Sequence, residues 1–288
     1  MGIPIALATG SITPMERLAQ EAGGRLWFQV VVWNDRDLTM NQIKRAKDAG
    51  YEALVVTVDF GISSNRSHNV RNGFAVPFRF NRRNIPDLMT HPRWCMQVMG
   101  KYLLNTGLPR HMNYPEGQQR SIFARMGETK VLHAMRSLNA NWDDLGRIRD
   151  AWPGILIVKG LQHADDALRA VERGAQGIVV SNHGGRLMDS AAASLDTLPE
   201  IAAAVGDKCT ILLDSGVRRG SDIVKALALG AKTVMAGRPT IFGVATAGQA
   251  GGEHALKLLR REYMQTLGFV GCHSAAEIGP DVLGPSHD

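Results

Sequence analysis

Seven short apolar runs, separated by segments of helical character, constrain the fold of this chain more than any other feature. Buried parallel strands are nearly continuous in apolar residues, and parallel neighbours need a crossover that is usually a helix. The alternation therefore predicts an α/β fold with a parallel sheet and right-handed crossovers. A closed TIM-type (β/α)8 barrel has eight strands, so the sequence predicts such a barrel with one βα unit lacking. The runs are Ile3–Ala8, Leu26–Trp33, Ala53–Asp59, Ile155–Lys159, Gly177–Ser181, Thr210–Asp214 and Thr233–Ala236.

Helices are expected between these runs. Thr13, Pro14 and Glu16 form the pattern of a helix start, with Thr13 as the cap, Pro14 in the first turn and Glu16 three residues after the cap. The other expected helices are Leu38–Gly50, Trp142–Ala151, His163–Gly174, Ser194–Val205, Ser221–Gly230 and a terminal segment that reaches about Leu267.

The alternation stops between Phe60 and about Asn141. A connection of this length is generally a functional loop or a disordered one. A chain of 288 residues suits one large α/β domain. We therefore expect residues 1–288 to form a single domain with residues 60–141 as an insertion after the strand that ends at Asp59, and with short helices near Trp94–Leu104.

The basic charge of the chain belongs to this insertion. Between Gly61 and Arg136 there are twelve Lys and Arg against three Asp and Glu, although the whole chain has a net charge of only +6. No nucleic-acid recognition motif accompanies the charge, so nucleic acid is not an expected partner. An anionic membrane surface contacted by residues 61–136 and a merely solvated loop are both open interpretations.

The three cysteines, Cys95, Cys209 and Cys272, are far apart in the sequence. They have no metal-ligand spacing, and their odd number favours a reducing compartment over a disulfide framework. The N-terminus has no signal-peptide pattern, and no stretch of about 18 apolar residues occurs. These features predict a cytoplasmic protein without a metal site.

Polar and ionisable residues stand at the carboxyl ends of successive runs. A barrel would bring them to one face, which is the active-site face of this architecture. Gln29 is notable because a polar amide inside a buried strand needs partners, and a ligand is one way to supply them. The residues are Thr9, Gln29, Thr57, Asp59, Lys159, His183, Arg186, Asp214, Arg218, Gly237 and Arg238.

The types of these residues indicate a phosphorylated cofactor and an anionic substrate. Arg218 and Arg238 follow the last two runs, where barrels often bind phosphate through loop amides and a helix N-terminus. Lys159 would stabilise negative charge on a redox ring, and His183 would act as a general base. Asp59 would then orient the His183 imidazole and stabilise its charged form.

Plainer interpretations remain beside this one. His183 could be an exposed histidine in a βα loop, and the arginines could contact surface carboxylates. A non-redox barrel, such as a sugar-phosphate isomerase or an aldolase, would use Lys159 to form a Schiff base. A catalytically silent barrel that only binds or oligomerises is the third alternative.

Five motifs resemble one family, the FMN-dependent α-hydroxy acid dehydrogenases and oxidases. The resemblance runs from about Gly2 to Gly271. The segment from Asp214 to Ala231, together with His91-Pro92-Arg93-Trp94, is most similar to the membrane-associated branch of (S)-mandelate and L-lactate dehydrogenases. The motifs are Ser181-Asn182-His183-Gly184-Gly185-Arg186, Val158-Lys159-Gly160, Thr57-Val58-Asp59, Asp214-Ser215-Gly216-Val217-Arg218 and Gly237-Arg238.

The resemblance implies FMN-dependent oxidation of an L-2-hydroxy acid, mandelate-like or lactate-like, to the 2-oxo acid. It implies a quinone or respiratory acceptor, with an oxidase that passes electrons to oxygen as the alternative. It also implies a peripheral position on the inner face of the cytoplasmic membrane, and we expect a homo-oligomer. The implied roles are His183 and Asp59 in catalysis, Arg186 and Arg66 at the substrate, and Gln29, Thr57, Lys159, Ser181, Asp214, Gly216, Arg218, Gly237 and Arg238 at FMN.

Three departures from the family pattern bear on activity. The chain begins at the family's second barrel strand, so the lacking unit is the first. Val31 stands where the family has a tyrosine, and Ala8 stands where many members have a serine. Leu187-Met188 also replaces the usual Gln-Leu. We expect weaker FMN affinity or an altered substrate preference unless another chain completes the barrel, and an open barrel exposes strand edges.

Overall fold

The computed structural model describes residues 2–62, 64, 66–75, 78–116, 119, 121–123 and 140–284. These residues divide into two compact units, the first up to Leu156 and the second from Ile157, so the boundary falls within one strand. The expectation of a single domain over residues 1–288 stays a prediction.

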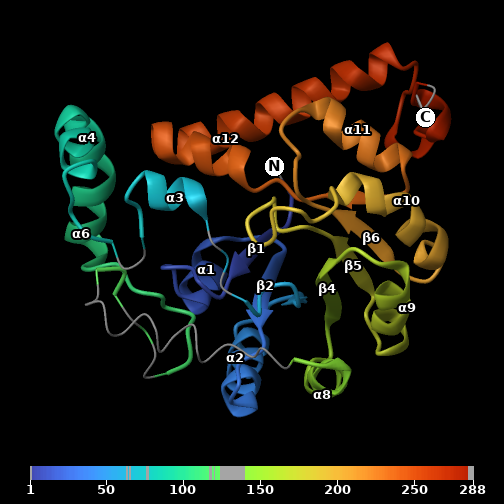
Figure 1. Ribbon diagram of the computed structural model, residues 1–288, viewed down its shortest axis with the longest axis horizontal. Helices are drawn as coiled ribbons and strands as arrows, with labels where there is room; N and C mark the ends of the chain where they lie inside the picture. Colours follow the sequence, from blue (N-terminus) through green and yellow to red (C-terminus); the bar gives the residue numbers. More distant parts are fainter. Residues whose placement is uncertain are drawn as a thin grey trace. The chain divides into compact units, whose positions relative to one another are not determined.

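The first unit begins with three βα steps and continues into the insertion (Figure 1). A capping box at Asn141 starts α8 at the expected residue. The elements are β1 (Ile5–Ala8), α1 (Met15–Glu21), β2 (Leu26–Val31), α2 (Arg36–Asp48), β3 (Ala53–Thr57), α3 (Ser67–Arg71), α4 (Asn84–Thr90), α5 (Pro92–Trp94), the π-helix η1 (Cys95–Gly100), α6 (Lys101–Thr106), α8 (Trp142–Ala151) and the start of β4 (Ile155–Leu161).

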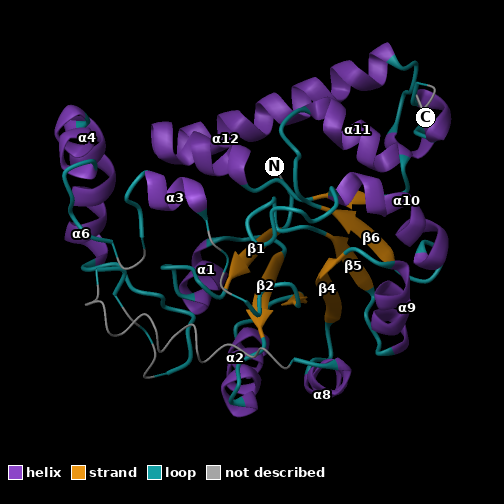
Figure 2. Cartoon of the chain, in the orientation of Figure 1, coloured by secondary structure: helices purple, strands orange, loops and turns teal. Residues whose placement is uncertain are grey.

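The second unit continues the alternation, and α9, α10 and α11 lie along its strands (Figure 2). Its last long helix has a kink at Ala247 and Gly248, whose backbone angles are not helical. After β4 the elements are α9 (Ala164–Glu172), β5 (Gly177–Val180), α10 (Ser194–Val205), β6 (Thr210–Leu213), α11 (Gly220–Ala228), β7 (Thr233–Val234), α12 (Arg238–Phe269) and the short 3-10 helices η2 (Ala275–Glu277) and η3 (Pro280–Val282).

All described strand pairs are parallel. In the first unit β1 pairs with β2 and β2 with β3, and in the second unit β4 pairs with β5, β5 with β6 and β6 with β7. Seven strands occur in the described part of the chain, and each is followed by a helix. This arrangement confirms the expected α/β class, a TIM-type barrel with seven βα units.

Burial explains why these runs are strands. Every residue of β3 and of β5 is buried, as expected for strands covered on both faces.

Five of the seven strands end one or two residues before the predicted end, and β4 ends two residues later. Polar residues such as Asp59 and Asp214 therefore lie in loops directly after the strands rather than within them.

The prediction that Thr13 caps α1 is wrong. Pro14 precedes the helix, and the first helical N–H, that of Met15, donates to Asn113 Oδ1 at 2.8 Å. Asn113 is fully buried and also donates from Nδ2 to the Thr13 carbonyl at 2.9 Å. Glu16 instead pairs with Arg45 of α2. Asn113, a residue of the insertion, thus supplies the acceptor that Thr13 was expected to supply.

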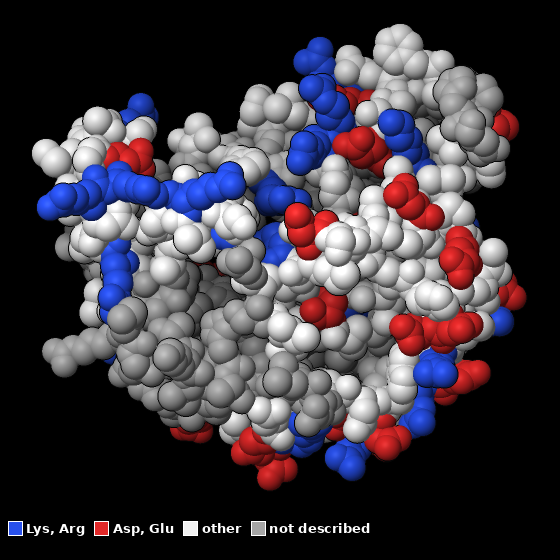
Figure 3. All heavy atoms as spheres, in the orientation of Figure 1, with Lys and Arg blue, Asp and Glu red and all other residues white. Residues whose placement is uncertain are grey.

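Helices α4 to α6, residues 84–106, form an arm that lies apart from the strands of its own unit (Figure 1). Short helices were expected here. Figure 3 shows Lys and Arg side chains in a row over this part of the surface. The exposed basic residues in and next to the arm are Arg71, Arg79, Arg82, Arg83, Arg93, Lys101 and Arg110.

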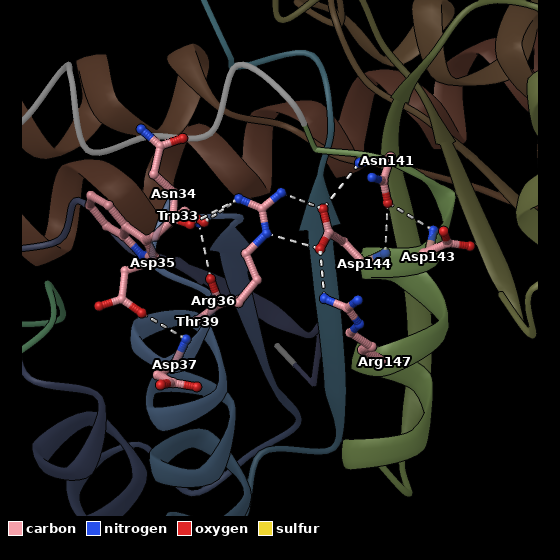
Figure 4. Close-up of polar contacts among 10 residues, drawn as sticks. All are labelled: Trp33, Asn34, Asp35, Arg36, Asp37, Thr39, Asn141, Asp143, Asp144 and Arg147. Carbon is pink, nitrogen blue, oxygen red and sulfur yellow. Dashed lines mark hydrogen bonds and ion pairs between the residues drawn. The ribbon is translucent and has the colours of Figure 1, made fainter.

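An ion pair joins the start of α2 to the start of α8 (Figure 4). Arg36 Nε donates to Asp144 Oδ1 at 2.9 Å, and Arg36 Nη2 donates to Oδ2 at 2.7 Å. Burial alone would raise the pKa of Asp144, but hydrogen bonds from Arg36 and the Asn141 backbone and the positive charges of Arg36 and Arg147 hold that pKa below its usual value. The chain that returns from the insertion is therefore held at the start of α2.

Candidate active site

In the first unit, Gln29 of β2 bridges its two neighbouring strands. Gln29 Nε2 donates to Thr57 Oγ1 at 2.8 Å, and Gln29 Oε1 accepts the Thr9 N–H at 3.3 Å. Thr9 Oγ1 donates to the Gln29 carbonyl at 2.7 Å. The structure thus brings together two residues expected at FMN, and protein groups satisfy the half-buried amide. Thr9 joins them, although its position at a strand end was its only signal in the sequence.

Asp59 and Arg66 follow the same strand. Asp59 lies two residues after β3, and Arg66 directly precedes α3; both side chains are half-buried. Arg66 Nε donates to Ser64 Oγ at 3.2 Å. The predicted roles of Asp59 beside the His183 imidazole and of Arg66 at the substrate carboxylate stay predictions.

The departure at Val31 lies in a small apolar cluster at the end of β2. Val31 packs with Trp33 and Tyr114, and all three are buried. The rings of Trp33 and Tyr114 meet edge to face with centroids 5.3 Å apart. Tyr114 comes from the insertion, so the insertion covers this end of the strand.

In the second unit, Lys159 of β4 lies between a hydroxyl and a carboxylate. Its Nζ donates to Ser181 Oγ at 2.7 Å and pairs with Asp214 Oδ2 at 2.9 Å. The exposed fractions of the Lys159 and Asp214 side chains are only 12% and 19%. A register shift in β4, beside Gly160 at φ +102°, occurs directly after the lysine. This geometry fixes a positive charge in a place of low solvent access, where electrostatic effects are strong.

His183 lies in the turn after β5 and has a left-handed backbone conformation, with φ at +56°. Its N–H donates to Ser181 Oγ at 3.0 Å. The next residue, Gly184, donates its N–H to Ser215 Oγ at 2.9 Å and accepts from Arg238 Nη2 at 3.0 Å. Gly184 has φ at +69°, and a Cβ there would also lie 2.6 Å from Arg238 Nη2, so the turn favours glycine at this position. The backbone beside the predicted base is thus held from three loops.

The remaining predicted residues of this unit fit a phosphate group. Arg186, Arg218 and Arg238 are exposed, and α12 begins at Arg238 with Gly237 as its N-cap. Space is open around Gly216 and Gly237 where a Cβ would stand. Arginines, open loop backbone and the N-terminus of a long helix together match the chemistry of a phosphate dianion. The residues present therefore fit the phosphate end of FMN, and Lys159 fits its ring.

Ser215 is the functional candidate that reasoning from the sequence missed. It has φ at +75° and contacts both Gly184 and Asp214. Its only signal in the sequence is a serine between an aspartate and a glycine at a strand end.

Comparison with known proteins identifies the family of the chain. Residues 1–285 match the FMN-dependent dehydrogenase family. The chain is 37% identical over 284 residues to (S)-mandelate dehydrogenase of Pseudomonas putida, covering 98% of this chain and 69% of that protein. It is 40% identical to L-lactate dehydrogenase of Xanthomonas campestris pv. campestris, covering 98% of this chain and 72% of that protein.

Similar solved structures come from the same family of proteins. The crystal structure of the monotopic membrane protein (S)-mandelate dehydrogenase matches 99% of this chain and 73% of its own, with a TM-score of 0.89 and 36% identity. A mandelate oxidase variant with (S)-mandelic acid matches 96% of this chain and 67% of its own, with a TM-score of 0.72 and 33% identity. A related mandelate oxidase structure contains an FMN adduct. The chain therefore belongs to the family of FMN-dependent hydroxy acid dehydrogenases and oxidases, and it is an oxidoreductase whose cofactor is FMN.

Proposed function

We propose that this chain oxidises an L-2-hydroxy acid of the mandelate or lactate class to the 2-oxo acid and passes the electrons to a quinone or another respiratory acceptor. The observation that carries the proposal is the hydrogen-bond network of the second unit, in which the largely buried Lys159 ammonium and the backbone N–H of His183 both contact the Ser181 hydroxyl. A cation and a base held together in this way suit removal of electrons and a proton from one substrate carbon and its hydroxyl.

The reaction removes two electrons and two protons from the substrate CH–OH group. Bound FMN supplies the acceptor for both electrons and for one proton. His183 takes the other proton and returns it to solvent. Lys159 would supply positive charge to the ring of bound FMN, and Ser181 and Asp214 keep its ammonium group in place.

Arginines are proposed to select the substrate. Arg186 follows His183 by three residues and is exposed, and we assign its guanidinium a bidentate contact with the substrate carboxylate. We assign Arg66 the same task and Asp59 the task of stabilising the His183 imidazolium. A double-mutant cycle with Asp59→Asn and His183→Ala tests the second assignment, because independent residues would have additive effects on the logarithm of kcat.

The decisive experiment is the visible spectrum of the purified chain reconstituted with FMN, before and after anaerobic addition of (S)-mandelate or L-lactate. We expect the flavin bands to bleach with wild type and with His163→Ala, since His163 is an exposed residue outside the site. His183→Ala should retain the bands and bleach at least about 100-fold more slowly than wild type. A wild-type chain that never bleaches would support the silent barrel, and a chain that binds sugar phosphate but no flavin would support the Schiff-base alternative.

The electron acceptor needs its own measurement. Turnover with a soluble quinone analogue should be much faster than turnover with oxygen. Rapid formation of peroxide instead would identify an oxidase and overturn this part of the proposal.

We propose further that the arm, residues 84–106, contacts an anionic membrane surface. Within the residues described, no helix combines the length and apolar character needed to cross a bilayer. The arm nevertheless exposes large apolar side chains, including Met89 at 76%, Met96 at 68% and Leu104 at 89%. Exposed arginines and a lysine flank them. Apolar side chains beside basic ones suit the interface of a bilayer with anionic headgroups.

Flotation with vesicles tests this contact. We expect the chain to bind vesicles that contain phosphatidylglycerol and to bind pure phosphatidylcholine much less. Arg82→Glu with Arg93→Glu should reduce binding, whereas Lys44→Glu with Lys47→Glu on α2 should not. Equal binding by all of these proteins, or no binding by wild type, would contradict the proposal. The expected homo-oligomer also stays a prediction, which light scattering would test.

A further inference from the structure

Ser215 lies where the loops after β5 and β6 meet. Its Oγ accepts the N–H of Gly184 at 2.9 Å and donates to Asp214 Oδ1 at 2.9 Å. One hydroxyl therefore serves as acceptor and donor at once, which uses its single proton fully. The contact with Gly184 joins residues 31 positions apart in the chain.

These contacts close a ring of hydrogen bonds around the predicted base. From Asp214 the ring continues through Oδ2 to Lys159 Nζ at 2.9 Å, and from Nζ to Ser181 Oγ at 2.7 Å. Ser181 Oγ accepts the N–H of His183 at 3.0 Å. The peptide bond between His183 and Gly184 closes the ring. The N–H groups of these two residues donate to the hydroxyls of Ser181 and Ser215, and both hydroxyls contact the ion pair between Lys159 and Asp214.

The backbone is strained at two residues of this ring. Among the described residues, His183 and Ser215 are the two non-glycine residues with positive φ, at +56° and +75°. Such conformations persist where the surrounding contacts over-determine them, and they concentrate at functional sites. The Ser215 hydroxyl is one of the contacts that hold the His183 turn.

We propose that Ser215 is a positioning residue: its hydroxyl holds the left-handed turn that carries His183 and orients the Asp214 carboxylate toward Lys159. It need not touch the substrate, because it acts through the Gly184 amide and the ion pair. The proposal goes beyond the roles assigned above and rests on the proposed function for its catalytic consequence. Its structural consequence, a held turn, can be measured without any reaction.

Ser215→Gly separates the hydroxyl from the backbone conformation. Glycine adopts positive φ more readily than serine, so the variant keeps this backbone conformation accessible while it removes the hydroxyl together with Cβ. If Ser215 served only the backbone, glycine would be an equal or better residue at this position. Ser274→Gly is the matched control, because its hydroxyl contacts only Glu277 among the described side chains and is far from the turn in sequence.

The first readout is amide hydrogen exchange of the peptide that spans residues 181–187, measured without substrate. We expect faster exchange in Ser215→Gly and no change in Ser274→Gly. The second readout is the rate of anaerobic flavin bleaching together with kcat and KM. We expect kcat to fall by about 10- to 100-fold with FMN still bound, and KM to change by less than about threefold.

Unchanged exchange at the turn in Ser215→Gly would overturn the proposal, whether or not FMN is lost. Faster exchange with unchanged kcat would also overturn it. If wild type does not bleach with any 2-hydroxy acid, the proposed function fails, and the exchange experiment alone decides whether Ser215 holds the turn. Should the glycine variant not fold, Ser215→Ala against Ser274→Ala makes the same comparison.

Discussion

Replacement of Arg36 by methionine tests how the chain returning from the insertion is held. The Arg36 guanidinium donates two hydrogen bonds to the Asp144 carboxylate and, from Nη1, two more to the carbonyls of Trp33 at 3.0 Å and Asn34 at 3.1 Å (Figure 4). Only 6% of the Asp144 side chain and 26% of the Arg36 side chain are exposed. Methionine keeps most of the aliphatic stem and removes all four of these hydrogen bonds.

The magnitude follows from this burial. Loss of one partner of a buried ion pair typically costs about 3–5 kcal/mol, because the other charge stays buried without compensation. Water reaches about a quarter of Arg36, so we lower the expected cost of Arg36→Met to about 2–3 kcal/mol at pH 7. Lys44→Met is the matched control: its partner is Asp48, the two side chains are 73% and 58% exposed, and the expected cost is below about 0.5 kcal/mol.

The cost should depend on pH. The pKa of Asp144 lies below its ordinary value in the folded protein, so the carboxylate stabilises the fold above its unfolded pKa, and this contribution is lost as the pH falls through the folded pKa. Without Arg36, burial dominates and the pKa of Asp144 rises, so the variant protonates this group more readily. The difference in stability between wild type and Arg36→Met should therefore shrink as the pH is lowered from 7 toward 4.

Urea unfolding followed by the fluorescence of Trp33 and Trp152, both buried in the first unit, measures these differences. Hydrogen exchange of α8 adds a local readout, since its start should open first in Arg36→Met. An Arg36→Met variant no less stable than Lys44→Met, or a difference that does not change with pH, would refute this reasoning.

Three further changes test other parts of the structure. Asn113→Ala leaves the Met15 N–H without its acceptor and should destabilise the first unit by about 1–3 kcal/mol, seen as faster exchange of the α1 amides. A Cβ at Gly220 would lie 1.9 Å from the α12 backbone, so Gly220→Ala should cost about 1–3 kcal/mol in thermal or urea unfolding. Lys159→Met leaves the Asp214 carboxylate without its cation, and a fluorescence titration should show FMN bound about tenfold more weakly.

Local patterns account for most of the secondary structure. Short apolar runs predict each of the seven strands, because a run such as Gly177–Val180 has no polar residue to expose. Helix α8 starts and ends at the predicted residues, because its capping box lies within the helix's own sequence. Residues at strand ends, such as Lys159 and His183, could be named as site candidates because parallel strands bring their carboxyl ends to one side.

The contacts that hold these elements could not be predicted in the same way. Asn113 caps α1 from 98 residues away, and Asp144 meets Arg36 across 108 residues. Ser215 reaches Gly184 from the next loop of the barrel. The sequence by itself determined the order of strands and helices and the chemistry at the strand ends, because these depend on side chains close together in the chain. Only the tertiary structure decided which donors meet which acceptors, because that depends on distances between segments far apart in sequence.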